Sequence, residues 1–210
     1  MTEYKEMTRE ELEPCAMLAA DAFFDYEYFS NYIPNDKHRK HFLNTLLDLE
    51  FRLNMGKPGT TFFTAKNNGK LAAAAQLCAP GFKRPSDPEY LMGGWMKVLF
   101  RGGVRRVNVW HKIEMLAAAP CHELPGKNWY LSLLTVARSE KGKGTGTRFL
   151  NEYLVPYTKN AGGETFSLFT NSESNLAFYE KNGFTIFDEK QFEFEGKTTR
   201  SWSLVLDLRK

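Results

Sequence analysis

Residues 141–147 read Lys-Gly-Lys-Gly-Thr-Gly-Thr, between the apolar run Trp129 to Val136 and the helix-like run Arg148 to Tyr157. A glycine-rich turn that leaves a strand and opens a helix directs several backbone N–H groups and the positive helix end at one point. A phosphate suits that point, because its oxygens accept hydrogen bonds from these groups. The stretch therefore predicts a phosphate-bearing ligand, and a plain glycine-rich turn is the alternative.

The run matches neither of two common nucleotide-binding motifs. Thr147 stands where the dinucleotide fingerprint requires Gly or Ala. The Gly-Lys-Thr at residues 196–198 has Gln191 at the position where a P-loop requires its first Gly. The identity of the phosphate ligand therefore depends on the residues that follow.

A second pattern lies downstream. After the strand-like run Thr165 to Phe169, residues 175–184 read Asn-Leu-Ala-Phe-Tyr-Glu-Lys-Asn-Gly-Phe. The order is strand, glycine-rich turn, helix, strand, short helix with Asn and Tyr, Gly-Phe, strand. Over about residues 128–190 this order and these residues resemble the GNAT superfamily of N-acetyltransferases. Lys141 departs from the pattern, because the family has Gln or Arg there. Lysine can still bind a pyrophosphate, but as a point charge that lacks the paired N–H donors of arginine.

The resemblance implies the fold. It predicts an α/β domain of the GNAT acyltransferase type, with a twisted, mixed central sheet flanked by helices. Acetyl coenzyme A would lie in the V between the splayed middle strands. Residues 1–210 are expected to form a single domain, and a helical insertion at about 81–118 is expected on the acceptor side.

The resemblance also implies a role for each part of the motif. Backbone N–H groups of the turn would cap the pyrophosphate of acetyl coenzyme A, with charge from the two lysines, while the strand Tyr130 to Val136 would pair with the pantetheine and polarise the acetyl carbonyl. No metal is expected. The implied cofactor-binding residues are Leu134, Thr135, Val136, Lys141, Gly142, Lys143, Gly144, Thr145, Gly146, Thr147 and Asn175.

Tyr179 is the candidate general acid, since in this family its helix faces the cofactor sulfur and a neutral phenol can protonate a departing thiolate. The alternative is a tyrosine that only packs against the helix. A base must deprotonate an ammonium acceptor before attack, and no single one is chosen. The candidate bases just before or near the central strand are His111, Glu114, His122 and Glu123.

The expected activity is transfer of the acetyl group of acetyl coenzyme A to an amine, by direct attack in a ternary complex. A small-molecule amine is favoured, because the aromatic segment Phe23 to Tyr32 and the insertion together should enclose the acceptor. Cys121 is expected to be a buried thiol rather than a nucleophile. The alternatives are an inactive acyl-coenzyme A-binding or regulatory module, a protein (lysine or N-terminal) acetyltransferase, or nucleic-acid binding through the basic stretch 83–112.

Composition sets the outer limits. The chain has 210 residues, 42% hydrophobic and 14% aromatic, which suffices for the core of one domain. A net charge of +3 is too small to require nucleic acid. Three separated cysteines encode neither a disulfide scaffold nor a zinc knuckle and favour a reducing cytoplasm. With a charged start and no long apolar run, a soluble, unprocessed cytoplasmic protein is expected, with no membrane partner and a possible homodimer through the final hairpin.

Periodicity predicts the remaining elements. In the helix Arg9 to Phe24, the apolar face is expected at Leu12, Met17, Leu18 and Ala22. The aromatic residues of segment 23–32 are read either as core or as a wall of the acceptor pocket, and the basic insertion either as a solvated face or as a docking surface. The other expected elements are a strand at Tyr4 to Met7, a helix at Lys37 to Met55, a hairpin of Thr60 to Ala65 with Lys70 to Cys78, helices at Pro88 to Phe100 and Val104 to Met115, and a final hairpin at Lys190 to Leu208.

Overall fold

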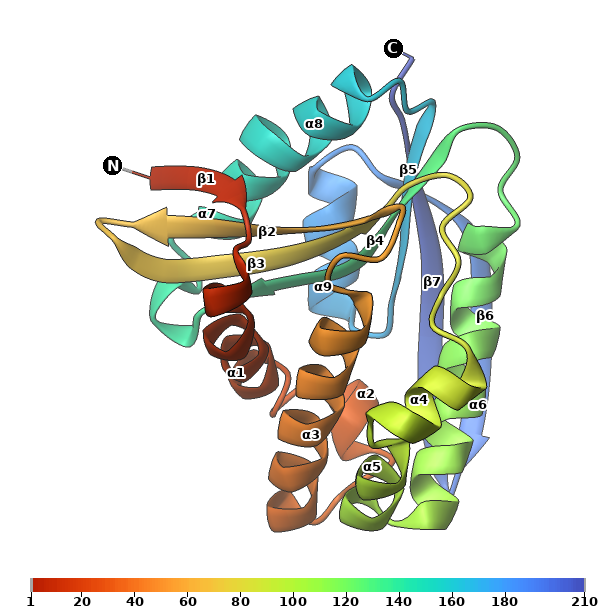
Figure 1. Ribbon diagram of the computed structural model, residues 1–210. Coiled ribbons are helices and arrows are strands. Elements are labelled where there is room, and N and C mark those ends of the chain that lie inside the picture. Colours follow the sequence, from red (N-terminus) through yellow and green to blue (C-terminus); the bar gives the residue numbers. More distant parts are fainter. Residues whose placement is uncertain (1, 210) are drawn as a thin grey trace.

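A computed structural model describes residues 2–209, and its centre is a seven-stranded mixed sheet in the order β1-β2-β3-β4-β5-β7-β6 (Figure 1). Only the pair β4 and β5 is parallel; the other neighbours are antiparallel. This is the mixed α/β sheet that the sequence predicts. The strands are β1 (Thr2–Glu6), β2 (Thr60–Asn67), β3 (Lys70–Cys78), β4 (Asn128–Val136), β5 (Thr165–Thr170), β6 (Thr185–Phe194) and β7 (Lys197–Asp207).

Helices cover both faces of the sheet (Figure 1). On one face lie the 3₁₀ turn η1 (Arg9–Glu11), α1 (Leu12–Ala22), α2 (Glu27–Ser30), α3 (Asp36–Asn54), α4 (Asp87–Gly93), α5 (Trp95–Gly102) and α6 (Val104–His122). On the other face lie α7 (Thr145–Arg148), the π-helical turn η3 (Phe149–Leu154), α8 (Val155–Asn160) and α9 (Glu173–Lys181). The 3₁₀ turn η2 (Arg138–Glu140) follows β4.

The strands supply two hydrophobic cores because successive side chains point to opposite faces. Phe62 joins the core beneath α1 and α3, whereas its neighbour Phe63 joins the core beneath η3 and α8. In β3, Ala74 faces the first core, and Ala73 and Ala75 face the second. The small alanines let helices approach the middle of the sheet from both sides.

The predicted hairpin of β2 and β3 is confirmed. Asn68 and Gly69 both have positive φ, of 49° and 76°. That conformation is the one that a tight two-residue hairpin turn requires, and Asn and Gly adopt it at the lowest cost. The final hairpin of β6 and β7 is confirmed too, and it begins earlier than expected, at Thr185.

The apolar face predicted for the first helix is wrong. Met17 is 63% exposed, and Leu12, Leu18 and Ala22 are only partly buried. The small residues carry the contact instead, because α1 packs closely against α3 and the sheet and a bulky side chain would hold it away. The buried residues of α1 are Cys15, Ala16, Ala19 and Ala20.

The insertion contains three helices rather than the two predicted. Gly94 and Gly103, with φ of 118° and 88°, separate α4, α5 and α6. The last helix runs on to His122 instead of ending near Met115, and it passes through Pro120. Proline removes the hydrogen bond to the carbonyl four residues earlier, and here Lys190 donates from Nζ to that Leu116 carbonyl at 2.9 Å. A side chain from β6 thus replaces the missing helical bond.

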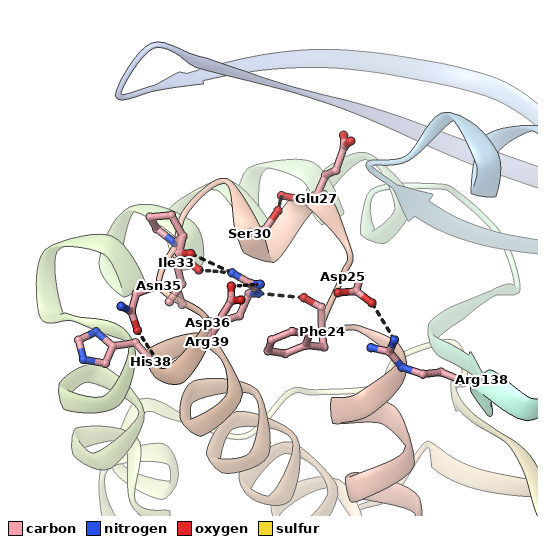
Figure 2. A network of polar contacts seen from close by, with 11 residues as sticks. Phe24, Asp25, Glu27, Ser30, Ile33, Asn35, Asp36, His38, Arg39 and Arg138 are labelled. Carbon is pink, nitrogen blue, oxygen red and sulfur yellow. Dashed lines mark hydrogen bonds and ion pairs between the residues drawn. The ribbon is translucent and has the colours of Figure 1, made fainter.

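A buried arginine holds the aromatic segment 23–32 in place (Figure 2). Arg39 on α3 is 6% exposed, and its guanidinium donates to the carbonyl oxygens of Phe24 and Ile33 at 2.9 and 3.0 Å. It donates to the Pro34 carbonyl at 3.2 Å and pairs with Asp36 at 2.7 Å. Both ends of the segment are therefore tied to one side chain, which fixes its path over the sheet.

We expect Arg39→Ala to destabilise the protein by about 3 kcal/mol, because three carbonyls and a carboxylate lose their donor. Urea denaturation against the wild type measures the change. The matched control is Lys40→Ala, since Lys40 is the next residue on α3 and is exposed, and it should change stability by less than about 0.5 kcal/mol. Equal effects of the two substitutions would contradict the role given to Arg39.

Candidate active site

The two parallel strands part early. Pairing between β4 and β5 is limited to Asn128 with Thr165, Trp129 with Phe166 and Tyr130 with Ser167. Beyond Tyr130, β4 continues to Val136 alongside β3, while β5 continues alongside β7. Among residues 2–209, the edge of β4 that faces β5 therefore has no strand partner from residue 131 onward. This is the V that the sequence predicts.

The glycine-rich turn follows the end of β4, at the open end of the V. Gly142 and Gly144 have φ of 78° and 74°, and a helical segment starts at Thr145 and runs on through η3 and α8 to Asn160. Glu140 fixes the turn from inside, because its carboxylate accepts from Asn67 Nδ2 at 2.7 Å and from Thr145 Oγ1 at 3.2 Å. At Gly142 the turn faces open space, since a Cβ at this position would meet no atom within 4 Å.

Two cavities meet at the splay. The larger, about 1170 Å³, follows the glycine-rich turn and the end of β4. The smaller, about 540 Å³, lies on the side of α3 and α6. The residues that line both are Phe23, Tyr26, Leu134, Asn171, Asn175 and Tyr179. A group held in one cavity can therefore reach a group held in the other at this junction.

The structure brings the predicted cofactor-binding residues together. All of them except Lys143 line the larger cavity. Lys143 is paired with Glu140 at 3.3 Å, whereas Lys141 makes no ion pair with any residue between 2 and 209. Arg138, which the sequence analysis left out, also lines this cavity and pairs with Asp21 at 3.0 Å. It also pairs with Asp25 at 2.8 Å (Figure 2).

Tyr179 lies on α9 at the junction. Its ring packs against Phe178 and Phe184, with centroids 5.0 and 5.5 Å away, and the residue is 8% exposed. Burial raises the pKa of Tyr179 above its usual value, so the phenol holds its proton at neutral pH. No hydrogen bond of this hydroxyl to another described residue is present. The ring is thus both packed and positioned where the cavities meet.

A search of known protein families finds one matching domain. Residues 113–202 match the family described as acetyltransferase (GNAT) domain. This match covers the glycine-rich turn and the helix with Asn175 and Tyr179, so this part of the chain is similar to a GNAT acetyltransferase domain. The mixed sheet with its splayed pair of strands is the scaffold on which the two cavities are built.

Solved structures share this GNAT fold at low identity. A histone acetyltransferase HPA2 and related acetyltransferase from Corynebacterium glutamicum superposes with a TM-score of 0.65 at 17% identity, covering 98% of this chain and 96% of that one. The PaiA N-acetyltransferase from Thermoplasma acidophilum, solved in complex with coenzyme A, gives 0.57 at 14%, covering 99% of each chain. The ribosomal-protein-S18-alanine N-acetyltransferase from Escherichia coli gives 0.57 at 15%, covering 99% and 94%. No curated protein matches by sequence.

The smaller cavity contains a carboxylate that the sequence analysis missed. Glu50 Oε2 accepts from the Tyr90 hydroxyl and from Asn54 Nδ2, each at 3.1 Å. Burial and the charge of Glu114 raise the pKa of Glu50 to about 7. One feature of the sequence could have indicated Glu50: it is a charged residue on the apolar side of a helix, four residues after Leu46.

Three of the four candidate bases line the same cavity, namely His111, Glu114 and His122. Burial raises the pKa of Glu114 and lowers the pKa of both histidines, and the nearby charge of Arg84 lowers all three. Glu123 is exposed and does not line the cavity. Within residues 2–209, no cluster of three or more His, Cys, Asp or Glu could hold a metal ion, and no helix has the length and apolarity to cross a membrane.

The raised pKa of Glu50 makes stability depend on pH. The unfolded chain releases this proton near 4.5 and the folded chain near 7, so stability falls as pH rises between those values. Glu50→Gln removes this contribution, so the free energy of unfolding of the variant relative to that of the wild type should rise by about 2 kcal/mol from pH 5 to pH 8. Urea denaturation at the two pH values measures the gain. A constant difference between the two proteins would show that Glu50 titrates normally.

Proposed function

We propose that this enzyme transfers the acetyl group of acetyl coenzyme A to a primary amine of a small molecule, by direct attack in a ternary complex. The observation that carries the proposal is the junction of the two cavities at Leu134 and Tyr179. A cofactor in the larger cavity and an acceptor in the smaller one would meet there without crossing protein. Direct attack needs this geometry, because the amine and the thioester must be bound together.

The residues of the larger cavity fit coenzyme A. The turn at 141–147 offers backbone N–H groups and an unpaired cation for a pyrophosphate, and the free edge of β4 offers backbone groups for amides in an extended ligand. The Thr135 hydroxyl, in a residue only 3% exposed, has no protein partner among the described residues and lines this cavity. The coenzyme A complex of the Thermoplasma protein supports the same ligand here. When bound, acetyl coenzyme A supplies the thioester.

The protein's own groups then handle charge and protons. The amine nitrogen bonds to the carbonyl carbon, and a backbone N–H near Thr135 or Val136 stabilises the oxygen as it gains negative charge. The carbon–sulfur bond would break, the Tyr179 hydroxyl would protonate the leaving sulfur, and the proton lost by the nitrogen would restore the Tyr179 hydroxyl. An ammonium acceptor must lose a proton before this, and Glu50, His111, Glu114 and His122 are the titratable groups of the acceptor cavity.

The enclosure of the smaller cavity favours a small acceptor. Its walls come from α3, from the aromatic segment and from the insertion helices α4 to α6. A volume of about 540 Å³ lies within the usual range for sites that bury a small ligand. Tyr28 and Phe29 are buried in the core and also line this cavity, which supports both interpretations of the aromatic segment.

We expect Tyr179→Phe to lower kcat by about 100-fold or more, because the thiolate loses its proton donor. Coenzyme A affinity measured by calorimetry should change by less than about twofold, since an exposed or unpaired hydroxyl contributes little to binding. Turnover is followed as thiol release with a panel of amines. Tyr157→Phe, on α8 and outside both cavities, is the matched control and should retain full activity.

Three outcomes separate the alternatives. Full turnover in Tyr179→Phe would contradict its role as the acid. Coenzyme A binding without thiol release with any small amine or peptide would indicate a regulatory module. Thiol release with lysine-containing or N-terminal peptides alone would indicate a protein acetyltransferase.

A further inference from the structure

We propose that the acceptor is a diamine whose second ammonium group binds between Glu50 and Glu114 while its first amine reaches the junction at Tyr179. This inference rests on the proposed function and specifies its substrate class. Four observations carry it: two carboxylates that line one cavity without a cationic partner, two buried donors without partners, an aromatic wall, and the position of this group away from the reaction centre.

The two carboxylates come from different helices and point into one cavity. Glu50 lies on α3 and Glu114 on α6, both line the smaller cavity, and the charge of Glu114 contributes to the raised pKa of Glu50. The Glu114 side chain is 33% accessible. Burial nevertheless raises its pKa, because the side chain faces the cavity rather than bulk solvent. Neither makes an ion pair with a lysine or arginine among the described residues; Glu114 approaches only His111 Nδ1, at 4.0 Å. Two carboxylates without a cation are costly, and a cation from a ligand removes that cost.

One oxygen of Glu50 is left for a ligand. Oε2 accepts the two protein donors, from Tyr90 and Asn54, whereas Oε1 accepts no hydrogen bond from any residue in the range 2–209. An ammonium group has three N–H donors and no acceptor, so it can bond to this oxygen and to Glu114 together.

Two further polar groups of the cavity have no protein partner. The Tyr28 hydroxyl and Trp110 Nε1 are unpaired among the described residues, although Tyr28 is only 4% exposed and Trp110 only 6%. Both residues line the cavity, and the charge of Glu114 contributes to the raised pKa of Tyr28, which places that ring beside the carboxylate. Buried polar groups in native proteins are rarely left unpaired, so these two indicate a ligand or the hydration that it replaces.

The rest of the lining suits an alkyl chain with a cationic end. Tyr28, Tyr90, Trp95 and Trp110 form an aromatic wall around the carboxylates. Aromatic faces attract ammonium groups and also pack against methylene groups. The nearby cation, Arg84, is exposed and lies over the Tyr90 ring, with its centre 5.4 Å from the ring centroid. Arg84 therefore offsets part of the acidic charge without pairing with either carboxylate.

The carboxylates lie away from the junction. Glu50 and Glu114 line only the smaller cavity, whereas Leu134 and Tyr179 line both cavities. Part of the smaller cavity therefore separates the carboxylates from an amine that reacts at the junction. A second cationic group at the end of an alkyl chain can reach them from there.

The experiment compares two probes that differ by one ammonium group, hexylamine and hexane-1,6-diamine. Binding of each to the coenzyme A-loaded protein is measured by calorimetry, and thiol release gives the ratio of their kcat/KM values. We expect the wild type to prefer the diamine at least tenfold in both measurements. Glu50→Gln and Glu114→Gln should each reduce that preference at least fivefold. Glu123→Gln, with an exposed carboxylate outside the cavity, is the matched control and should keep it.

The outcomes separate this inference from the function on which it rests. Equal use of the two probes by the wild type, or an unchanged preference in both Gln variants, would overturn the diamine site while leaving acetyl transfer intact. A preference for amino acids over both probes would overturn it as well and would assign Arg84 to a carboxylate. If the diamine binds and its binding depends on Glu50 and Glu114, but no thiol is released, the result would support the site and contradict the proposed function.

Discussion

The limited pairing of β4 with β5 is the constraint on which the site depends. Backbone N–H and C=O groups in a sheet normally find partners, and beyond Tyr130 one edge of β4 lacks a strand partner. β5 is drawn away because it pairs along its whole length with β7. Side chains hold the closed end of the V together: Asn128 Nδ2 donates to Ser167 Oγ at 3.0 Å, and Thr165 Oγ1 donates to Asn128 Oδ1 at 3.0 Å.

The aromatic segment connects the two halves of the open end. Tyr26 accepts a hydrogen bond from the backbone N–H of Asn171 at 2.7 Å and lies 3.2 Å from Thr170 Oγ1, so it is attached to the end of β5. Arg138, just after β4, pairs with Asp25 on the same segment. Since Arg39 fixes the segment from α3, one rigid piece of chain spans the V and contributes walls to both cavities. The separation of cofactor side and acceptor side therefore depends on packing as well as on strand pairing.

The sequence predicted the part of the site that is local in the chain and missed the part that is assembled from distant elements. The turn at 141–147 and the helix with Asn175 and Tyr179 are contiguous motifs, so their glycines and helix caps can be recognised in the sequence. Both line the cavity as expected. Glu50 carries no motif, and it shares the smaller cavity with Glu114 only because α3 and α6, which are far apart in the sequence, both line that cavity. The face of α1 was mispredicted because hydrophobicity favours Met17, whereas close packing selects Ala16, Ala19 and Ala20.

The central claim is that the unpaired edge of β4 receives the cofactor, and a crystal structure of the coenzyme A complex tests it most directly. The account predicts pantetheine extended along residues 131–136 between β4 and β5, with the sulfur beside Tyr179 and the pyrophosphate on the turn at 141–147. Coenzyme A bound elsewhere, or a closed V with β4 paired to β5 beyond Tyr130, would contradict the account.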